Sequence, residues 1–112
     1  MSLDFTIYLG VHESGSECIS FNITHNLAPM AKEAGLYAPL WRPEEHYAEP
    51  VLASDVYPAI MAGFNNLVID PEKYRQLNPG NGWGDYNGLI DFTANVLAAL
   101  RQYPLAVVEA CR

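Results

Sequence analysis

The sequence predicts a small α+β domain, in which an antiparallel sheet is packed on one face by about three helices. Two segments near the N-terminus alternate between apolar and polar residues, as half-buried strands do. The middle of the chain changes to the spacing of amphipathic helices, and a short valine-rich segment follows the last of them. The predicted order of elements is therefore ββαααβ, a segregation of strands and helices that is typical of α+β folds.

One domain is expected because the chain has 112 residues, of which 50% are hydrophobic. A chain of this size and composition supports a single core. No linker, repeat or low-complexity segment divides it, so we expect residues 1–112 to fold as one unit.

The sheet begins with a predicted hairpin, which joins residues 4–11 to residues 18–24 through the polar segment 12–17. On each strand the apolar residues fall on one face and the polar residues on the other. The valine-rich segment 105–110 must join this hairpin, because a lone strand is not stable in water. The apolar positions of the hairpin are Phe5, Ile7, Leu9, Val11, Ile19, Phe21 and Ile23.

Helical spacing and capping residues define the middle of the chain. Asn26 is a suitable N-cap for the first helix, and Gly35 is a suitable stop. Asp70 and Asp85 are placed to cap two later helices, since a carboxylate accepts hydrogen bonds from the free N–H groups of a first turn. Three prolines prevent residues 36–50 from forming one regular element. The predicted helical segments are 27–34, 54–68, the short 71–77, and a last one from about 86 to Pro104.

The charge balance argues against one class of partner. Thirteen acidic residues against six basic ones give a formal net charge of −7, whereas binding bulk DNA or RNA requires clustered Lys and Arg. No apolar stretch approaches the ~20 residues that span a bilayer, and no secretory signal is recognisable, so we expect no membrane partner and a cytoplasmic location. In that compartment we expect Cys18 and Cys111 to be reduced and mostly buried rather than joined in a disulfide.

No catalytic, metal or cofactor motif stands out. The three histidines lack the spacing of zinc ligands, and no serine lies in a nucleophile elbow. The glycines match neither a dinucleotide-binding nor a phosphate-loop pattern. We therefore expect no metal and no cofactor, and these observations lean against an enzyme.

A glycine-rich segment, residues 78–88, precedes the last predicted helix. We interpret it first as a helix-entry loop, in which Asp85 caps the helix and Trp83 covers the apolar core. The alternative is a ligand site, because backbone N–H groups at the start of a helix can hold an anion without basic side chains.

A candidate binding site comes from three segments that are separate in the sequence: a strand-to-helix junction, the proline-rich segment and the glycine-rich loop. If they converge, they offer ring surfaces, amide groups, one guanidinium and one carboxylate, which suit a small polar ring system such as a nucleobase. The alternative is that the Asn and Thr residues cap a helix while the tryptophans pack. The candidate residues are Asn22, Thr24, His25, Asn26, Trp41, Arg42, Trp83, Asp85 and Tyr86.

Two stretches of the chain read FNITHNLAPMAKEAGLYAPLWRPEE and NPGNGWGDYNGLIDF. Both resemble stretches of small hypothetical proteins encoded by bacteriophages and bacterial mobile elements. The resemblance implies a bacterial or phage-infected host cell and carries over no active site. Small phage proteins include inhibitors of host defence that sequester nucleotide signals, which favours a binding role. The lead hypothesis is a small noncatalytic binding protein for a nucleotide-like ligand. The alternative is a protein–protein interaction module, as a homodimer or as an inhibitor of a host protein.

Overall fold

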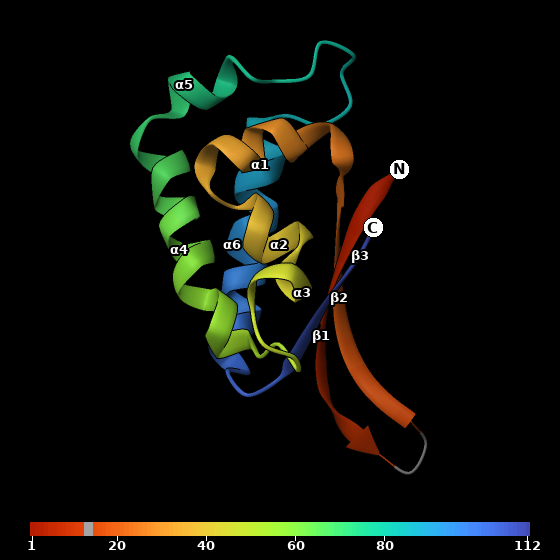
Figure 1. The fold of residues 1–112 in the computed structure, drawn as a ribbon. Helices are drawn as coiled ribbons and strands as arrows, with labels where there is room; N and C mark the ends of the chain where they lie inside the picture. Colours follow the sequence, from red (N-terminus) through yellow and green to blue (C-terminus); the bar gives the residue numbers. More distant parts are fainter. Residues whose placement is uncertain (13–14) are drawn as a thin grey trace.

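The structure, a computed structural model, describes residues 1–12 and 15–112. Within them the chain forms a three-stranded sheet with helices on one side of it (Figure 1). Strand β1 (Ser2–His12) lies between β2 (Gly15–Thr24) and β3 (Val107–Cys111), and both pairings are antiparallel. The predicted α+β class is confirmed, as is the pairing of the C-terminal strand with the hairpin.

From Ser2 to Tyr8 the register of the sheet follows the alternation in the sequence, and a bulge between Tyr8 and Gly10 then shifts the pairing with β2 by one residue, which the predicted alternation of residues 4–11 did not include. Phe5 lies opposite Phe21, and the side chain of Phe5 is fully buried beneath the helices. The two strands of the hairpin pair as far as His12 opposite Gly15. The centre of the predicted turn, residues 13–14, lies outside the described residues.

The helical middle contains more segments than predicted. The two long predicted helices are present as α4 (Ala53–Ile69) and α6 (Tyr86–Gln102), and the short predicted helix is α5 (Pro71–Arg75). Residues 36–50 contain two short helices, α2 (Tyr37–Trp41) and α3 (Pro43–His46), because Pro43 has no N–H to continue a helix but suits the first turn of a new one. The described helical segments are the 3₁₀ turn η1 (His25–Leu27), α1 (Ala28–Ala34), α2 (Tyr37–Trp41), α3 (Pro43–His46), α4 (Ala53–Ile69), α5 (Pro71–Arg75) and α6 (Tyr86–Gln102).

The helix ends show which predicted caps are correct. Asp85 and Asp70 each accept a hydrogen bond from a backbone N–H of the first turn, at 2.7 Å and 3.4 Å. Gly35 ends α1 with a left-handed φ of 84°. The prediction of Asn26 as an N-cap is wrong, because the chain first forms η1. There the hydroxyl of Thr24 accepts the backbone N–H of Asn26 at 3.3 Å.

The helices cover the sheet in two layers. α2, α3 and α6 contact the strands, whereas α4 packs against α6, α1 and α2. Figure 1 shows α4 on the side of the helical layer that is farthest from the sheet. The core fills the space between the sheet and the helices, and Phe5, Met30 and Trp41 are among its largest fully buried side chains.

The opposite face of the sheet carries no helix from the described part of the chain (Figure 1). Asp4, Asn22 and Cys111 form one row across the three strands on this face, and all three are exposed. Cys18 and Cys111 are free and exposed, so the prediction that they are mostly buried is wrong. Cys18 is four residues from Asn22 on β2, and this even spacing directs its side chain to the same open face.

Candidate functional site

The best-supported candidate site is a hollow of about 270 Å³ at the junction of the hairpin and the first helices. We call it the basic hollow. Its lining comes from η1, α1 and α2, from Arg42, which directly follows α2, and from Arg112, which directly follows β3. The lining residues are His25, Ala28, Lys32, Tyr37, Trp41, Arg42 and Arg112.

Positive charge is concentrated in the basic hollow. The whole chain has six Lys and Arg residues against thirteen acids, and three of the six, Lys32, Arg42 and Arg112, line this one hollow. Glu45 pairs with Arg42 and Glu44 pairs with Arg112, so part of the repulsion among the three cations is already offset by the protein itself. The basic hollow therefore gathers half of the basic residues of an acidic protein, and Lys32 is the one of the three that makes no ion pair with the described residues.

The floor of the hollow is a packed aromatic pair. Trp41 is only 1% exposed, and its indole N–H donates a hydrogen bond to Nδ1 of His25 at 3.0 Å. Because Nδ1 accepts this bond, neutral His25 carries its proton on Nε2, where it can act as a donor. The ring of Tyr37 stacks on Trp41, with centroids 5.7 Å apart and planes 12° apart.

Lys32 is the cation with the fewest competing contacts. Its ammonium lies 4.5 Å from the centroid of the Tyr37 ring, and it makes no ion pair with the described residues. The cation–π contact holds the side chain beside the hollow without neutralising its charge. A negatively charged ligand would therefore meet Lys32 as a free cation.

The two arginines are oriented by neighbouring side chains. Nε of Arg42 donates to the hydroxyl of Tyr37 at 3.4 Å, and its guanidinium lies 3.0 Å from a carboxylate oxygen of Glu45. The hydrogen bond to Tyr37 and the negative charge of Glu45 raise the pKa of Arg42 above its usual value. Arg112 donates to the backbone carbonyl of Trp41 and pairs with Glu44 at 3.0 Å. Both guanidiniums are held in place, but each already shares its charge with a carboxylate.

Of the site residues predicted at the strand-to-helix junction, only one lines the basic hollow. His25 reaches the basic hollow, whereas Asn22 lies on the open face of the sheet, where its amide donates to Ser2 and Asp4 at 2.8 Å each. Thr24 and Asn26 hold the turn at η1. The interpretation of Thr24 as a capping residue is therefore correct.

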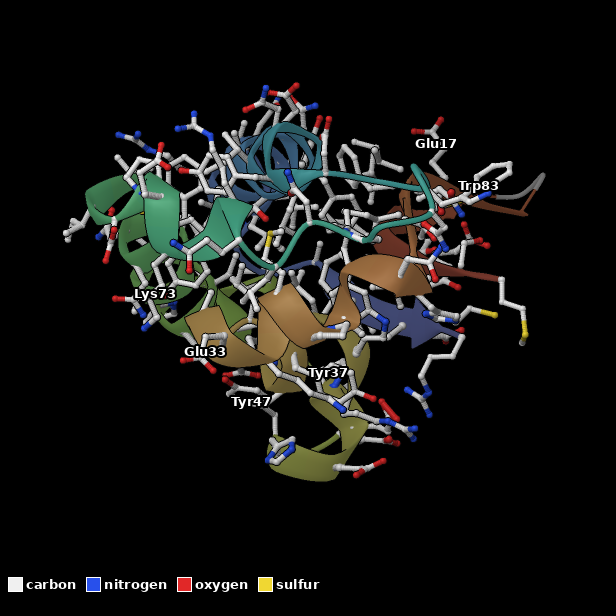
Figure 2. The ribbon with its side chains drawn as sticks, turned by 90° about the horizontal axis from the view of Figure 1, so that it is seen from above. Glu17, Glu33, Tyr37, Tyr47, Lys73 and Trp83 are labelled. Atoms are coloured by element: carbon white, nitrogen blue, oxygen red, sulfur yellow. The ribbon has the colours of Figure 1, made fainter. Side chains whose placement is uncertain are left out.

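The glycine-rich loop lies apart from the basic hollow. Figure 2 shows Trp83 and Tyr37 on separate parts of the molecule. Asp85 caps α6, and Tyr86 is buried with its hydroxyl donating to the backbone carbonyl of Leu67. Both residues therefore support the helix-entry interpretation of this loop.

The prediction that Trp83 covers the core is wrong, because its side chain is 70% exposed. The loop contacts the body of the protein through backbone at Gly84, where φ is 94°. A Cβ at Gly84 would lie 2.8 Å from Cγ2 of Thr24 and 3.0 Å from Cγ of Leu27, so only glycine permits this close approach. The loop is anchored by glycine, and the neighbouring indole remains in solvent.

Sequence reasoning placed His25, Trp41 and Arg42 together but missed Lys32, Tyr37 and Arg112. Lys32 is typical of the exposed face of any helix, and Arg112 is distant from the other lining residues in sequence.

Among residues 1–12 and 15–112, no group of three or more His, Cys, Asp or Glu side chains could hold a metal ion. No helix in that part of the chain is both long and apolar enough to cross a bilayer.

The lining of the basic hollow has the cations to bind an anion. Its aromatic floor, however, leaves little ring surface on which a nucleobase could stack. Trp41 is buried and Tyr37 is already engaged by Trp41 and Lys32, so stacking of a nucleobase between tryptophans is not supported. No family model, no curated protein and no solved structure matches this chain. The function must therefore be inferred from the residues of the hollow.

Proposed function

We propose that the protein is a small noncatalytic binding protein whose basic hollow takes a phosphate-bearing, nucleotide-like small molecule. The observation that carries this proposal is the convergence of three of six basic residues on one hollow of a chain with net charge −7. Guanidinium groups match the geometry of phosphate oxygens, and an ammonium supplies a mobile point charge.

The dimensions favour recognition of phosphate over recognition of a base. A hollow of about 270 Å³ is near the lower end of the range for small-molecule pockets, so part of the ligand would remain in solvent. The phosphate would lie between Lys32 and the two guanidiniums, and Nε2 of His25 would donate to the same ligand. Ala28 and the edge of Tyr37 supply apolar contact for a sugar.

Thermal-shift and calorimetric titrations with inorganic phosphate, adenosine monophosphate and adenosine test this proposal. We expect the two phosphate-bearing compounds to raise the melting temperature, because a ligand bound only by the folded state stabilises it. Adenosine should have no effect. Affinity should fall as salt rises, since the attraction is largely between charges.

Lys32→Ala is the decisive variant for the site. Loss of a charge-assisted contact costs about 1.5–3 kcal/mol, so we expect affinity for adenosine monophosphate to fall ~10- to 100-fold. Lys73→Ala is the matched control, because Lys73 carries the same charge on α5 outside the hollow and pairs with Glu33 at 3.4 Å. Equal loss in both variants, or no response of the parent to any phosphate compound, would contradict the proposal.

The resemblance to proteins of bacteriophages and mobile elements supports a bacterial cytoplasmic setting, in which such a protein could sequester a nucleotide signal. The second candidate function is that of a protein–protein interaction module or an inhibitor of a host protein. The observation that favours it is the apolar surface on the outer side of α4 and α6, where Tyr57, Met61 and Phe64 are only partly buried.

A further inference from the structure

A second surface, the α4–α6 groove, lies between α4 and α6, and its lining shares no residue with the basic hollow. Two adjoining hollows of about 250 Å³ and about 480 Å³ form it, and they share Tyr57 and Arg101. Its apolar lining includes Met61, Phe64, Ala94 and Ala98.

The two helices that form this groove carry few charged residues. From Val56 to Ile69 in α4 there is no charged residue, although most helices at a protein surface have a polar, charged outer face. α6 has only two charged residues, Asp91 and Arg101. Both are exposed, and neither makes an ion pair with the described residues.

Four residues of α6 are spaced so that they can pair with the same four residues of a second, antiparallel copy of the helix. Asp91, Ala94, Ala98 and Arg101 are separated by three, four and three positions, which places them along one helical seam. If two copies of α6 pack antiparallel in a register centred on sequence position 96, Ala94 lies opposite the partner subunit's Ala98. In the same register Asp91 lies opposite the partner subunit's Arg101.

We propose that the α4–α6 groove is the interface of a homodimer, in which α6 packs antiparallel against the partner's α6. Each of the two unpaired charges of α6 then gains an opposite charge, and the symmetry forms the pair twice. Alanines at the centre allow the two helices to approach closely, while Tyr57, Met61 and Phe64 of each α4 cover the flanks. This proposal is independent of ligand binding in the basic hollow.

Sedimentation equilibrium at micromolar concentration tests the assembly, and two charge reversals test its register. We expect the parent to be a dimer. Asp91→Arg places two arginines opposite each other at both ends of the seam, and Arg101→Asp places two aspartates there. Each reversal should weaken dimerisation by at least ~10-fold, because two favourable pairs become two repulsive ones.

A mixture of the two variants provides the most specific test. In a heterodimer of Asp91→Arg with Arg101→Asp, both ends of the seam again bring opposite charges together. The mixture should therefore dimerise when each variant alone does not, and the double variant should dimerise with itself. A merely structural role for either residue would not produce this rescue.

Matched controls distinguish the effect of the pairing register on dimerisation from the effect of a change in net charge. Glu49→Arg and Lys73→Asp change the net charge by the same amounts as the two test variants, but both residues lie outside the groove, so these proteins should remain dimers. A monomeric parent would overturn the proposal and leave the groove to another partner. A dimer that survives both single reversals, or a mixture that stays monomeric, would overturn the antiparallel register.

Discussion

The two tryptophans occupy opposite environments, so substitution of one should destabilise the protein strongly and substitution of the other should leave its stability nearly unchanged. Trp41 is 1% exposed and packs with Tyr37, whereas Trp83 is 70% exposed. We expect Trp41→Ala to lower the free energy of unfolding by about 3–5 kcal/mol, because it leaves a cavity in the core. Trp83→Ala should change it by no more than about 0.5 kcal/mol, as is usual at the surface.

Urea denaturation followed by far-ultraviolet circular dichroism measures both variants. The conservative variant Trp83→Phe is the control for loss of the ring at an exposed position, and it should match the parent. A loss of several kcal/mol in Trp83→Ala would show that the indole is packed against the protein in solution.

For single residues, the sequence predicts local roles such as helix capping better than it predicts which distant residues come together in the fold. Asp70 and Asp85 cap helices as their sequence contexts indicate, because capping depends only on the next few residues. The exposure of Trp83 depends instead on how closely Gly84 approaches Thr24, which no local pattern reveals. The arrival of Arg112 beside Trp41 likewise depends on the tertiary fold.

Gly63 lies where α4 approaches the α1–α2 connection closely. A Cβ at this position would lie 2.5 Å from Cδ2 of Leu36 and 3.2 Å from the carbonyl oxygen of Ala34. Leu36 is fully buried and has little room to move. Gly63→Ala should therefore reduce stability, although alanine is favoured over glycine in helices by about 1 kcal/mol, because overpacking costs about 1–3 kcal/mol.

Thermal and urea unfolding of Gly63→Ala would measure this balance. Asn65→Ala is a suitable control on the same helix, since Asn65 is exposed and should gain slightly from the better helix former. If Gly63→Ala proved more stable than the parent, α4 would be free to shift away from Leu36.

Among the helices and strands, periodicity identified β1, β2 and the long helices, because each keeps one face buried over many residues. β1 and β2 alternate, and α6 presents Leu89, Val96 and Leu100 to the core. The two helices between 36 and 50 could not be predicted in the same way. They are four or five residues long, which is too short for a helical period to emerge, and prolines interrupt them.

The whole molecule depends on β3, because this strand is the second partner of the central strand. Val108 is 4% exposed beneath the helices, and its backbone N–H donates to the carbonyl of Val51 at 2.9 Å. Deletion of residues 105–112 would remove these contacts and leave a two-stranded hairpin, which is marginal in water. We expect the truncated protein to show no cooperative thermal transition by calorimetry.

Arg112→Ala is the control for this truncation, because it removes the contacts of Arg112 with Glu44 and Trp41 while leaving the strand intact. It should unfold cooperatively. A truncated protein with the melting temperature of the parent would show that the hairpin and helices are sufficient for the fold.

The order of strands also determines when the sheet can form. β1 is the first element of the described chain and β3 the last, and Phe5 lies opposite Ala110. The β1–β2 hairpin is local and can close within about 1–10 μs, whereas β1 and β3 must meet across the entire helical region. Pairings between such distant segments slow folding, and they leave the unpaired edge of β1 open to other chains until β3 arrives. A newly synthesised chain would therefore have an incomplete sheet until its last strand has emerged from the ribosome.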